Sequence, residues 1–246
     1  MESRFAPAAS GPHAHHERPG PDRGGGGSDQ LVPLGLCAAW SRHAAELAVP
    51  LGTALQRWEE TPPTRVLVAE GYLARLLPGR YLPPDLLRTA VQRALALGCA
   101  LGAQLQSHHV IAGPSAAWVL LGGVPPAPAE LLSSAHRGDV AGVVIRTARL
   151  GTEEVETIGG SPVTVPVRTA TDLLRFTPAP VAAPLVRGLV DSGHVEVGQI
   201  RSRLQRMHRH PGAQSARARL EQMMGDGQAR DSGAAAPTGL PSAVTR

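Results

Sequence analysis

Ser161–Arg175 reads SPVTVPVRTATDLLR, and this stretch decides the fold of the second half of the chain. A β-branched, apolar run, Val163–Val167, leads into a segment with Pro166 in its first turn. Proline is tolerated there because the first N–H groups of a helix have no partner within the helix. Apolar residues then recur at three- and four-residue steps, at Val167, Ala170, Leu173 and Leu174. This spacing predicts a strand that feeds directly into a helix with one buried face.

Charged residues occupy the other side of this predicted helix. Asp172 follows Arg168 by four residues and precedes Arg175 by three, so it can pair with both. From the residues alone we expect a solvated charge ladder on a core helix. Such pairs stabilise a solvated helix by about 0.2–0.5 kcal/mol each.

The regions on either side give the α+β class and its boundaries. We expect disordered Gly/Pro/Ser-rich tails at residues 1–30 and 226–246, a first domain at 31–85 and a second at 86–225. In the first domain, a short helix at 64–70 precedes a hairpin of strands 72–77 and 80–82. Short helices followed by a small hairpin are the order of a winged helix-turn-helix.

The second domain is predicted to begin with a helix at 86–105 and a further helix near Pro114 and Ser115. We call Ser161–Arg175 the organising stretch, and the helix predicted within it the organising helix. Strands are expected at 139–150, at 153–158 and immediately before the organising helix, forming a small antiparallel sheet. Glu153–Glu156 would alternate along an exposed strand. Helices at 181–191, 195–207 and 213–224 would complete an α+β domain.

Composition excludes several chemistries. The chain has no lysine, and all 24 of its basic residues are arginine, so phosphate-loop, Schiff-base and nuclease lysines are impossible. No GxSxG or HExxH motif occurs, so we expect no enzyme, no metal and no cofactor. His108 and His109, and the tail residues His13, His15 and His16, lack partners at ligand spacing.

The expected location is the cytoplasm. No run reaches the roughly 20 apolar residues of a membrane span, and no apolar signal core is visible at the N-terminus. Cys37 and Cys99 belong to no disulfide framework and are expected to be reduced thiols.

Positive charge is concentrated in the second domain. Residues 86–225 hold 14 arginines against nine acids, whereas residues 31–85 hold five of each. Residues 199–219 contain no acid and six arginines: Arg201, Arg203, Arg206, Arg209, Arg217 and Arg219. This basic run can be a solvated surface, a nucleic-acid patch or a docking surface for an acidic partner.

Two blocks carry a family resemblance. RVLVAEGYLARLLPGRYLPP, residues 65–84, and the strand–helix block with Thr164, Arg168, Asp172 and Arg175 resemble the AbiEi antitoxins of type IV toxin–antitoxin systems. The match also includes Ser115-Ala116-Ala117, although residues 111–114 depart from the family pattern. It covers about Arg65 to Leu220.

The resemblance implies roles for both domains. Thr64 and Arg65 would begin a recognition helix in the DNA major groove, and Arg75 and Arg80 would touch phosphates from the wing. The second domain, with its basic run, would oppose a nucleotidyltransferase toxin without requiring a stable complex. The protein would also repress its own operon by binding operator DNA, with no membrane partner.

Other interpretations stay open. The first domain has no net charge, whereas DNA-binding domains usually show a basic footprint. It can therefore be a purely structural or a protein-binding winged helix. The chain as a whole can be a transcriptional regulator without a toxin partner, or a protein-interaction module.

Overall fold

The computed structural model describes residues 40–135 and 139–233, with side chains described as far as residue 225. The predicted tail 1–30, the three tail histidines and Cys37 lie outside these residues. Within them, the organising stretch folds as expected, because strand β8 (Ser161–Thr164) leads directly into helix α5 (Pro166–Phe176) with Pro166 in its first turn. Thr164 couples the two elements, since its hydroxyl lies 2.7 Å from the Thr169 hydroxyl, which also donates to the Thr164 carbonyl.

The remaining helices are α1 (Arg42–Ala54), α2 (Pro62–Ala69), α3 (Ala90–Leu101), α4 (Gly113–Leu121), α6 (Ala179–Asp191), α7 (Val197–Arg206) and α8 (Ala213–Gly233). Short 3-10 turns are η1 (Pro84–Leu87), η2 (Gly102–Gln104) and η3 (Thr152–Glu154). The helix expected at 86–105 is therefore interrupted. Thr89 ends the first turn and caps α3, where its side chain and that of Gln92 each accept from the other's backbone N–H. Helix α8 continues past the expected boundary at residue 225.

The strands form two sheets. The first is antiparallel, in the order β1 (Gln56–Arg57), β3 (Arg80–Leu82) and β2 (Ala74–Leu77). The second has the order β6 (Val143–Thr147), β5 (Ala129–Ser133), β4 (His109–Ile111), β8 and β7 (Val155–Ile158).

The expectation of a small antiparallel sheet in the second domain is wrong. The five-stranded sheet is mixed, because β4 runs parallel to β8 and β5 runs parallel to β6. Val163 of the organising stretch pairs with Ile111, 52 residues earlier in the chain. A parallel pair between strands so far apart in the chain is not revealed by local sequence patterns.

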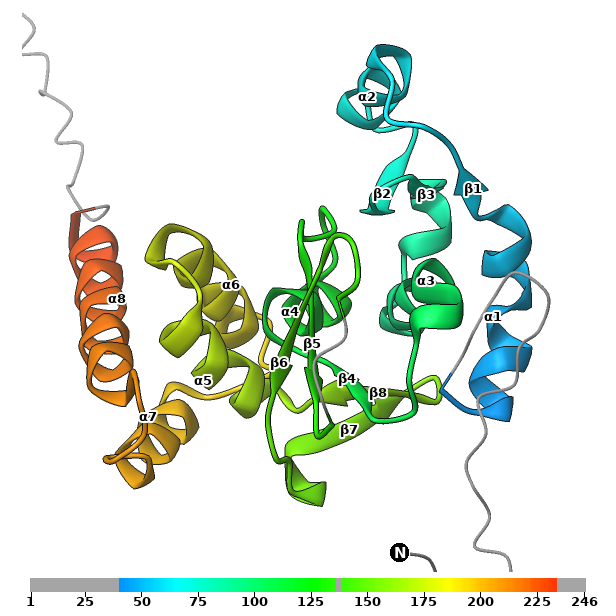
Figure 1. Ribbon diagram of the computed structural model, residues 1–246. Helices are drawn as coiled ribbons and strands as arrows, with labels where there is room; N and C mark the ends of the chain where they lie inside the picture. Colours follow the sequence, from blue (N-terminus) through cyan, green and yellow to red (C-terminus); the bar gives the residue numbers. More distant parts are fainter. Residues whose placement is uncertain (1–39, 136–138, 234–246) are drawn as a thin grey trace, which may run out of the picture.

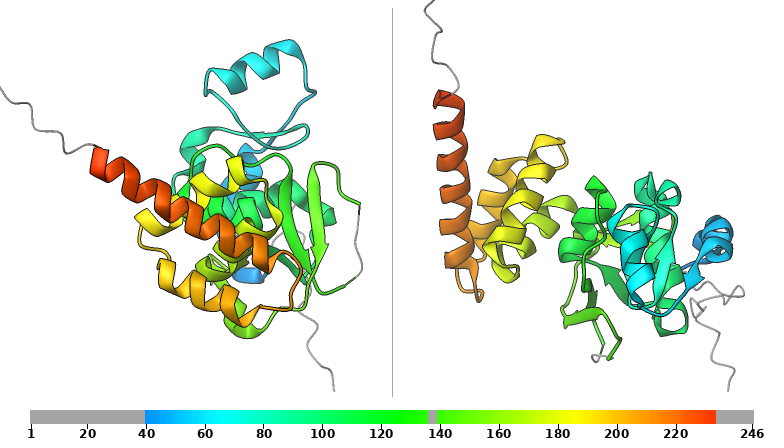
Figure 2. Two further views of the ribbon diagram at one scale, coloured as in Figure 1. Left: turned by 90° about the vertical axis from the view of Figure 1, so that its left-hand side faces the viewer. Right: turned by 90° about the horizontal axis from the view of Figure 1, so that it is seen from above.

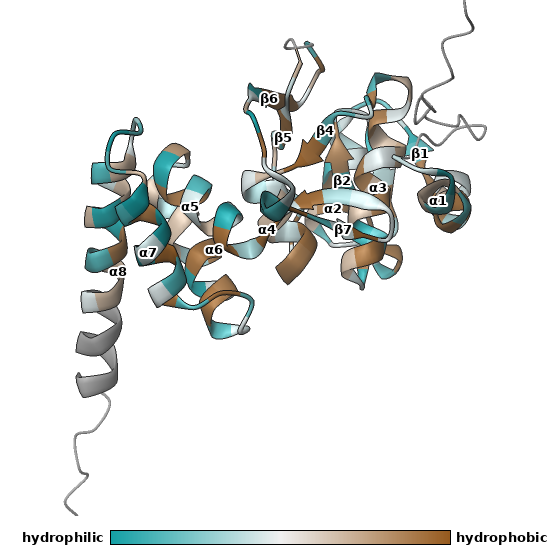
Figure 3. Ribbon diagram, turned by 90° about the horizontal axis from the view of Figure 1, so that it is seen from below, coloured by the Kyte–Doolittle hydropathy of each residue, from teal (hydrophilic) through white to brown (hydrophobic). Residues whose placement is uncertain are grey.

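The first apolar core joins residues on both sides of position 85. Helix α1 packs on α3, and α3 packs on η1, on the β2–β3 hairpin and on the five-stranded sheet. Trp40 is buried there, and its indole N–H donates to the His109 carbonyl at 2.7 Å. Hydrophobic residues gather on the strands and on α3 (Figure 3).

The second core is helical and surrounds α5. It combines buried residues of α4 to α8, including Leu173, Leu189, Leu204 and Leu220. Figures 1 and 2 show α5–α8 and α1–α3 at opposite ends of the molecule, with the five-stranded sheet and α4 between them. Helix α4 belongs to both cores, since Ala116 and Trp118 face the first and Ala117 faces the second.

Helix α2 stands away from this body (Figure 1), and Thr64 is its one buried residue. Gly71, which follows the C-cap residue Glu70, adopts φ +78° and so ends the helix in the way common for glycine. Cys99 is buried and disulfide-bonded, so the expectation of a reduced thiol is wrong for this residue. Among the described helices, none combines the length and apolar character that crossing a membrane requires.

Candidate functional site

The charged side of α5 faces the protein interior. Asp172 is 1% exposed, and the side chains of Arg168 and Arg175 are 11% and 7% exposed. The predicted pairs form: Arg168 Nε donates to Asp172 Oδ2 at 2.8 Å, and Arg175 Nη1 lies 3.6 Å from Oδ1. The expectation of a solvated ladder is wrong, because Glu154 of η3 pairs with Arg168, helix α7 packs on α5, and Arg175 donates to the Pro211 carbonyl.

Glu154 completes the network from the end of η3. Its carboxylate accepts from Arg168 Nη1 at 2.9 Å and also pairs with Arg203 of α7. The residue was expected on an exposed strand, but its side chain is 13% exposed. Glu154 therefore links the sheet, α5 and α7 through two guanidinium groups.

A cavity of about 350 Å³ opens beside this network. It is lined by Arg149, Glu154, Arg168, Arg175, Arg203, Arg206, Met207 and His210, and we call it the arginine cavity. Helices α5 and α7 supply four of its arginines. Arg149 comes from the loop after β6, and Met207 and His210 come from the turn between α7 and α8.

The pKa values around the cavity reflect burial first and the neighbouring charges second. Burial lowers the pKa of Arg175, Asp172 partly restores it, and the neighbouring charges of Arg168, Arg146 and Arg203 lower it further. Burial works against ionisation of Glu154, but hydrogen bonds from Arg203, the charge of Arg168 and the Gly151 N–H lower its pKa overall. Burial likewise opposes the charge of Arg168, yet Asp172 and Glu154 raise its pKa.

The ring of Phe176, directly after Arg175, contacts two arginines of this positive region. The guanidinium carbons of Arg146 and Arg175 both lie 4.3 Å from the centre of its ring. Such cation–π contacts hold arginines in place without neutralising them.

The six arginines of the basic run are not equivalent. Arg203 pairs with Glu154, Arg219 donates to the Leu174 and Thr177 carbonyls at 3.0 Å, and the exposed Arg201 pairs with Glu221 at 2.9 Å. Within the described part of the chain, the side chains of Arg206, Arg209 and Arg217 have no hydrogen bond or ion pair. The run therefore divides into three arginines with protein partners and three with charge to spare, of which only Arg206 lines the cavity.

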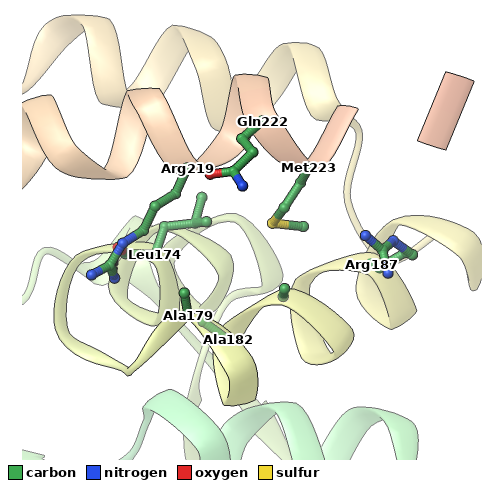
Figure 4. Close-up of a pocket in the computed structure, with 8 residues that line it drawn as sticks. Leu174, Ala179, Ala182, Arg187, Arg219, Gln222 and Met223 are labelled. Atoms are coloured by element: carbon green, nitrogen blue, oxygen red, sulfur yellow. Dashed lines mark hydrogen bonds between the residues drawn. The ribbon is translucent and has the colours of Figure 1, made fainter. Parts of the chain in front are cut away.

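Arg219 also lines a second, smaller cavity between α5, α6 and α8, of about 100 Å³. Met223 and Gln222 of α8 reach toward Leu174, Ala179 and Ala182 there (Figure 4). This cavity is mainly apolar. Because the Arg219 guanidinium is bonded to backbone carbonyls, it holds α8 against the end of α5.

The residues expected to contact DNA lie in different environments. Arg65 is exposed on α2, whereas Thr64 is buried, with its hydroxyl 2.9 Å from that of Thr61 and donating to the Glu59 carbonyl. Arg75 pairs with Glu60, and Arg80 is half-buried and donates to the Gly79 carbonyl. Arg65 is therefore the most accessible of the three arginines that were expected to contact DNA.

His108 and His109 are neighbours in the chain, and His109 lies in the protein interior. His109 is buried, burial and the neighbouring His108 lower its pKa, and its Nδ1 accepts from the Gln106 N–H at 3.2 Å. No group of three or more metal-ligating side chains occurs among the described residues.

Comparison with known proteins gives no family: no family model and no curated protein sequence matches the chain.

Sequence reasoning found Arg168, Arg175, Arg203 and Arg206 but did not place them together. It did not single out Arg149, His210 or the role of Glu154. The signal in the sequence was the high arginine content of residues 199–219 together with the charged residues of α5. The sequence does not show that these two segments lie in contact, because only the fold brings them together.

Proposed function

We propose that this protein is an antitoxin of the AbiEi type, which opposes a nucleotidyltransferase toxin and represses its own operon. The observation that carries the proposal is the block VTVPVRTATDLLR. Its Arg168 and Asp172, two residues of the resemblance, form the buried charge network beside the arginine cavity. In this proposal the C-terminal half acts on the toxin or on the toxin's substrates, and the protein works from the cytoplasm.

The N-terminal half would contact operator DNA in the manner of a winged helix. Helix α2 would be the reading helix, and the β2–β3 hairpin would be the wing. Support comes from the exposure of Arg65 on a helix that projects from the body (Figure 1). Arg75 would reach a phosphate only by leaving Glu60, because the pair already neutralises both charges.

The proposal predicts a nucleotidyltransferase gene in the neighbouring reading frame, whose absence would favour a stand-alone regulator, and co-expression with that enzyme tests the proposal. The full chain should restore growth to cells in which that enzyme is induced. It should also retard DNA from upstream of its own operon in a gel shift. Retarded DNA without restored growth would instead support a stand-alone regulator. If the protein neither restores growth nor retards DNA, a protein-interaction module is supported.

A further inference from the structure

The arginine cavity holds more positive charge than the protein neutralises. Five guanidiniums line it, against the carboxylates of Glu154, in its wall, and Asp172, directly beside it. These charges leave about three positive charges around one opening. Charge concentrated in a concave site attracts anions more strongly than the same charge spread over a surface.

Some of these arginines have donors to offer. Arg149 and Arg206 are exposed and, in the part of the chain that the structure describes, have no hydrogen bond or ion pair. The Nε of Arg203 is buried and has no hydrogen-bond partner there. Buried donors without a partner are uncommon in folded proteins, so the positive charge of Arg203 in the cavity wall is only partly paired by the protein.

The cavity is also held in shape by its own network. Glu154 and Asp172 fix Arg168 and Arg203, while Arg175 donates to the Pro211 carbonyl at 2.9 and 3.2 Å. Guanidiniums positioned before binding lose less entropy when a ligand arrives, which favours affinity. Arginine forks match the geometry of phosphate oxygens.

Charge and size together indicate how many phosphates would fit. One phosphate group carries about −1.5 to −2 near pH 7, which leaves part of the positive charge unpaired, whereas two linked phosphates carry about −3. A volume of about 350 Å³ lies within the range of small-molecule sites, roughly 300–1,000 Å³.

We propose that the arginine cavity binds a di- or triphosphate group, supplied either by a nucleotide or by the 5′ end of an RNA. Arg149 and Arg206 would hold the outer phosphate, and Arg203 and Arg175 the inner one. The proposal rests on the cavity alone and holds whether or not the protein neutralises a toxin.

Calorimetric titration of the full chain tests the site, with inorganic phosphate, pyrophosphate and ATP as probes. Pyrophosphate should bind at least tenfold more tightly than phosphate. Arg149→Gln and Arg206→Gln should each weaken pyrophosphate binding about tenfold or more, because each removes a charge-assisted hydrogen bond. The matched controls are Arg209→Gln and Arg217→Gln, which remove equal charge from the basic run outside the cavity and should change binding less than twofold.

A second pair of probes identifies the source of the phosphates. A short RNA with a 5′-triphosphate should bind more tightly than ATP if the ligand is RNA, whereas ATP should equal or exceed it if the ligand is a nucleotide. A 5′-hydroxyl RNA of the same sequence should bind weakly in either case. Equal losses in the cavity and control variants would overturn the proposal, as would failure of pyrophosphate and ATP to bind at millimolar concentration.

Discussion

At the residue scale, Asp172 is the carboxylate on which the organising helix depends most. It is almost fully buried between Arg168 and Arg175. Removing one member of a buried ion pair leaves an uncompensated charge and costs about 3–5 kcal/mol. We therefore expect Asp172→Ala to lower the free energy of unfolding by about 3 kcal/mol or more, measured by urea denaturation.

The surface pair Arg42–Glu46 supplies the control. Its side chains are 88% and 64% exposed, and it has the same four-residue spacing on a helix. Glu46→Ala should lower the free energy of unfolding by less than about 1 kcal/mol, as is typical of exposed pairs. Equal effects of the two substitutions would show that Asp172 is solvated in solution.

Glu154 makes the stability of the protein depend on pH. Its pKa in the folded protein lies below the value of an unfolded chain, about 4.3, despite the opposing effect of burial. Its contribution is therefore present above that pH and is lost as the pH falls through the folded-state pKa. The difference in free energy of unfolding between wild type and Glu154→Gln should shrink as the pH falls from 6 to 3.

Urea midpoints at several pH values measure this difference. Glu153→Gln is the control, since Glu153 is exposed and adjacent in sequence. Its difference from wild type should vary little across the range. A constant difference for Glu154→Gln would mean that the two arginines do not hold its carboxylate.

Arg65 carries the prediction for DNA. If α2 reads the operator, Arg65→Ala should cost about 1–3 kcal/mol of binding to the protein's own upstream DNA and relax sequence choice. Arg57→Ala is a suitable comparison, because Arg57 is an exposed arginine on β1 rather than on α2. A gel-shift titration measures both, and equal affinities for the Arg65 variant and wild type would contradict a reading role for α2.

At the scale of elements, the turn between β7 and β8 fixes helix α1 against the sheet. Gly160 adopts φ +82°, and a Cβ there would lie 2.7 Å from Ser41 Oγ and 2.9 Å from Ala44 Cβ. Gly193 has a similar φ of +73° but no atom within 4 Å of an added Cβ. The two positions therefore separate backbone strain from packing.

Gly193→Ala should cost about 1–2 kcal/mol, the strain of a left-handed alanine. Gly160→Ala should cost about 1–3 kcal/mol more, because the start of α1 must shift, as in other overpacked sites. Chemical denaturation of both variants gives the difference directly. Equal costs would mean that α1 does not rest on this turn.

Local patterns predicted most elements but not their assembly. The apolar spacing of Val167, Ala170, Leu173 and Leu174 placed α5 correctly, and the strands expected at 72–77 and 80–82 correspond to the β2–β3 hairpin. The parallel pairing of β4 with β8 could not be predicted, since it joins residues 52 positions apart. The same holds for the contact of Glu154 with Arg203, which brings the cavity together.

The charged residues of α5 show why the local sequence pattern led to a wrong prediction of their exposure. Arginine and aspartate are mostly exposed in proteins, so a helix side that carries them indicates solvent. Here each charge has an opposite charge within reach from the same or another element, and the side is covered. Only the long-range partners distinguish a buried network from a solvated one.

At the scale of the whole molecule, the first core joins α1 to α3 and the five-stranded sheet. The separation into domains at residue 85 stays a prediction, but a cut there removes Trp40, Leu77 and Leu82 from this core. We expect a fragment beginning at Leu86 to melt at a lower temperature than the full chain. Neutralisation is therefore tested on full-length variants.

The central claim is tested most directly by the growth of cells that express the nucleotidyltransferase which the proposal predicts in the neighbouring reading frame. The wild-type chain and Arg65→Ala should both restore growth, because the claim assigns neutralisation to the C-terminal half. The combined variant Arg206→Glu, Arg209→Glu, Arg217→Glu should fail at wild-type thermal stability, because it reverses the positive charge that has no protein partner. Failure of the wild-type chain to restore growth, or full rescue by the combined variant, would contradict the account.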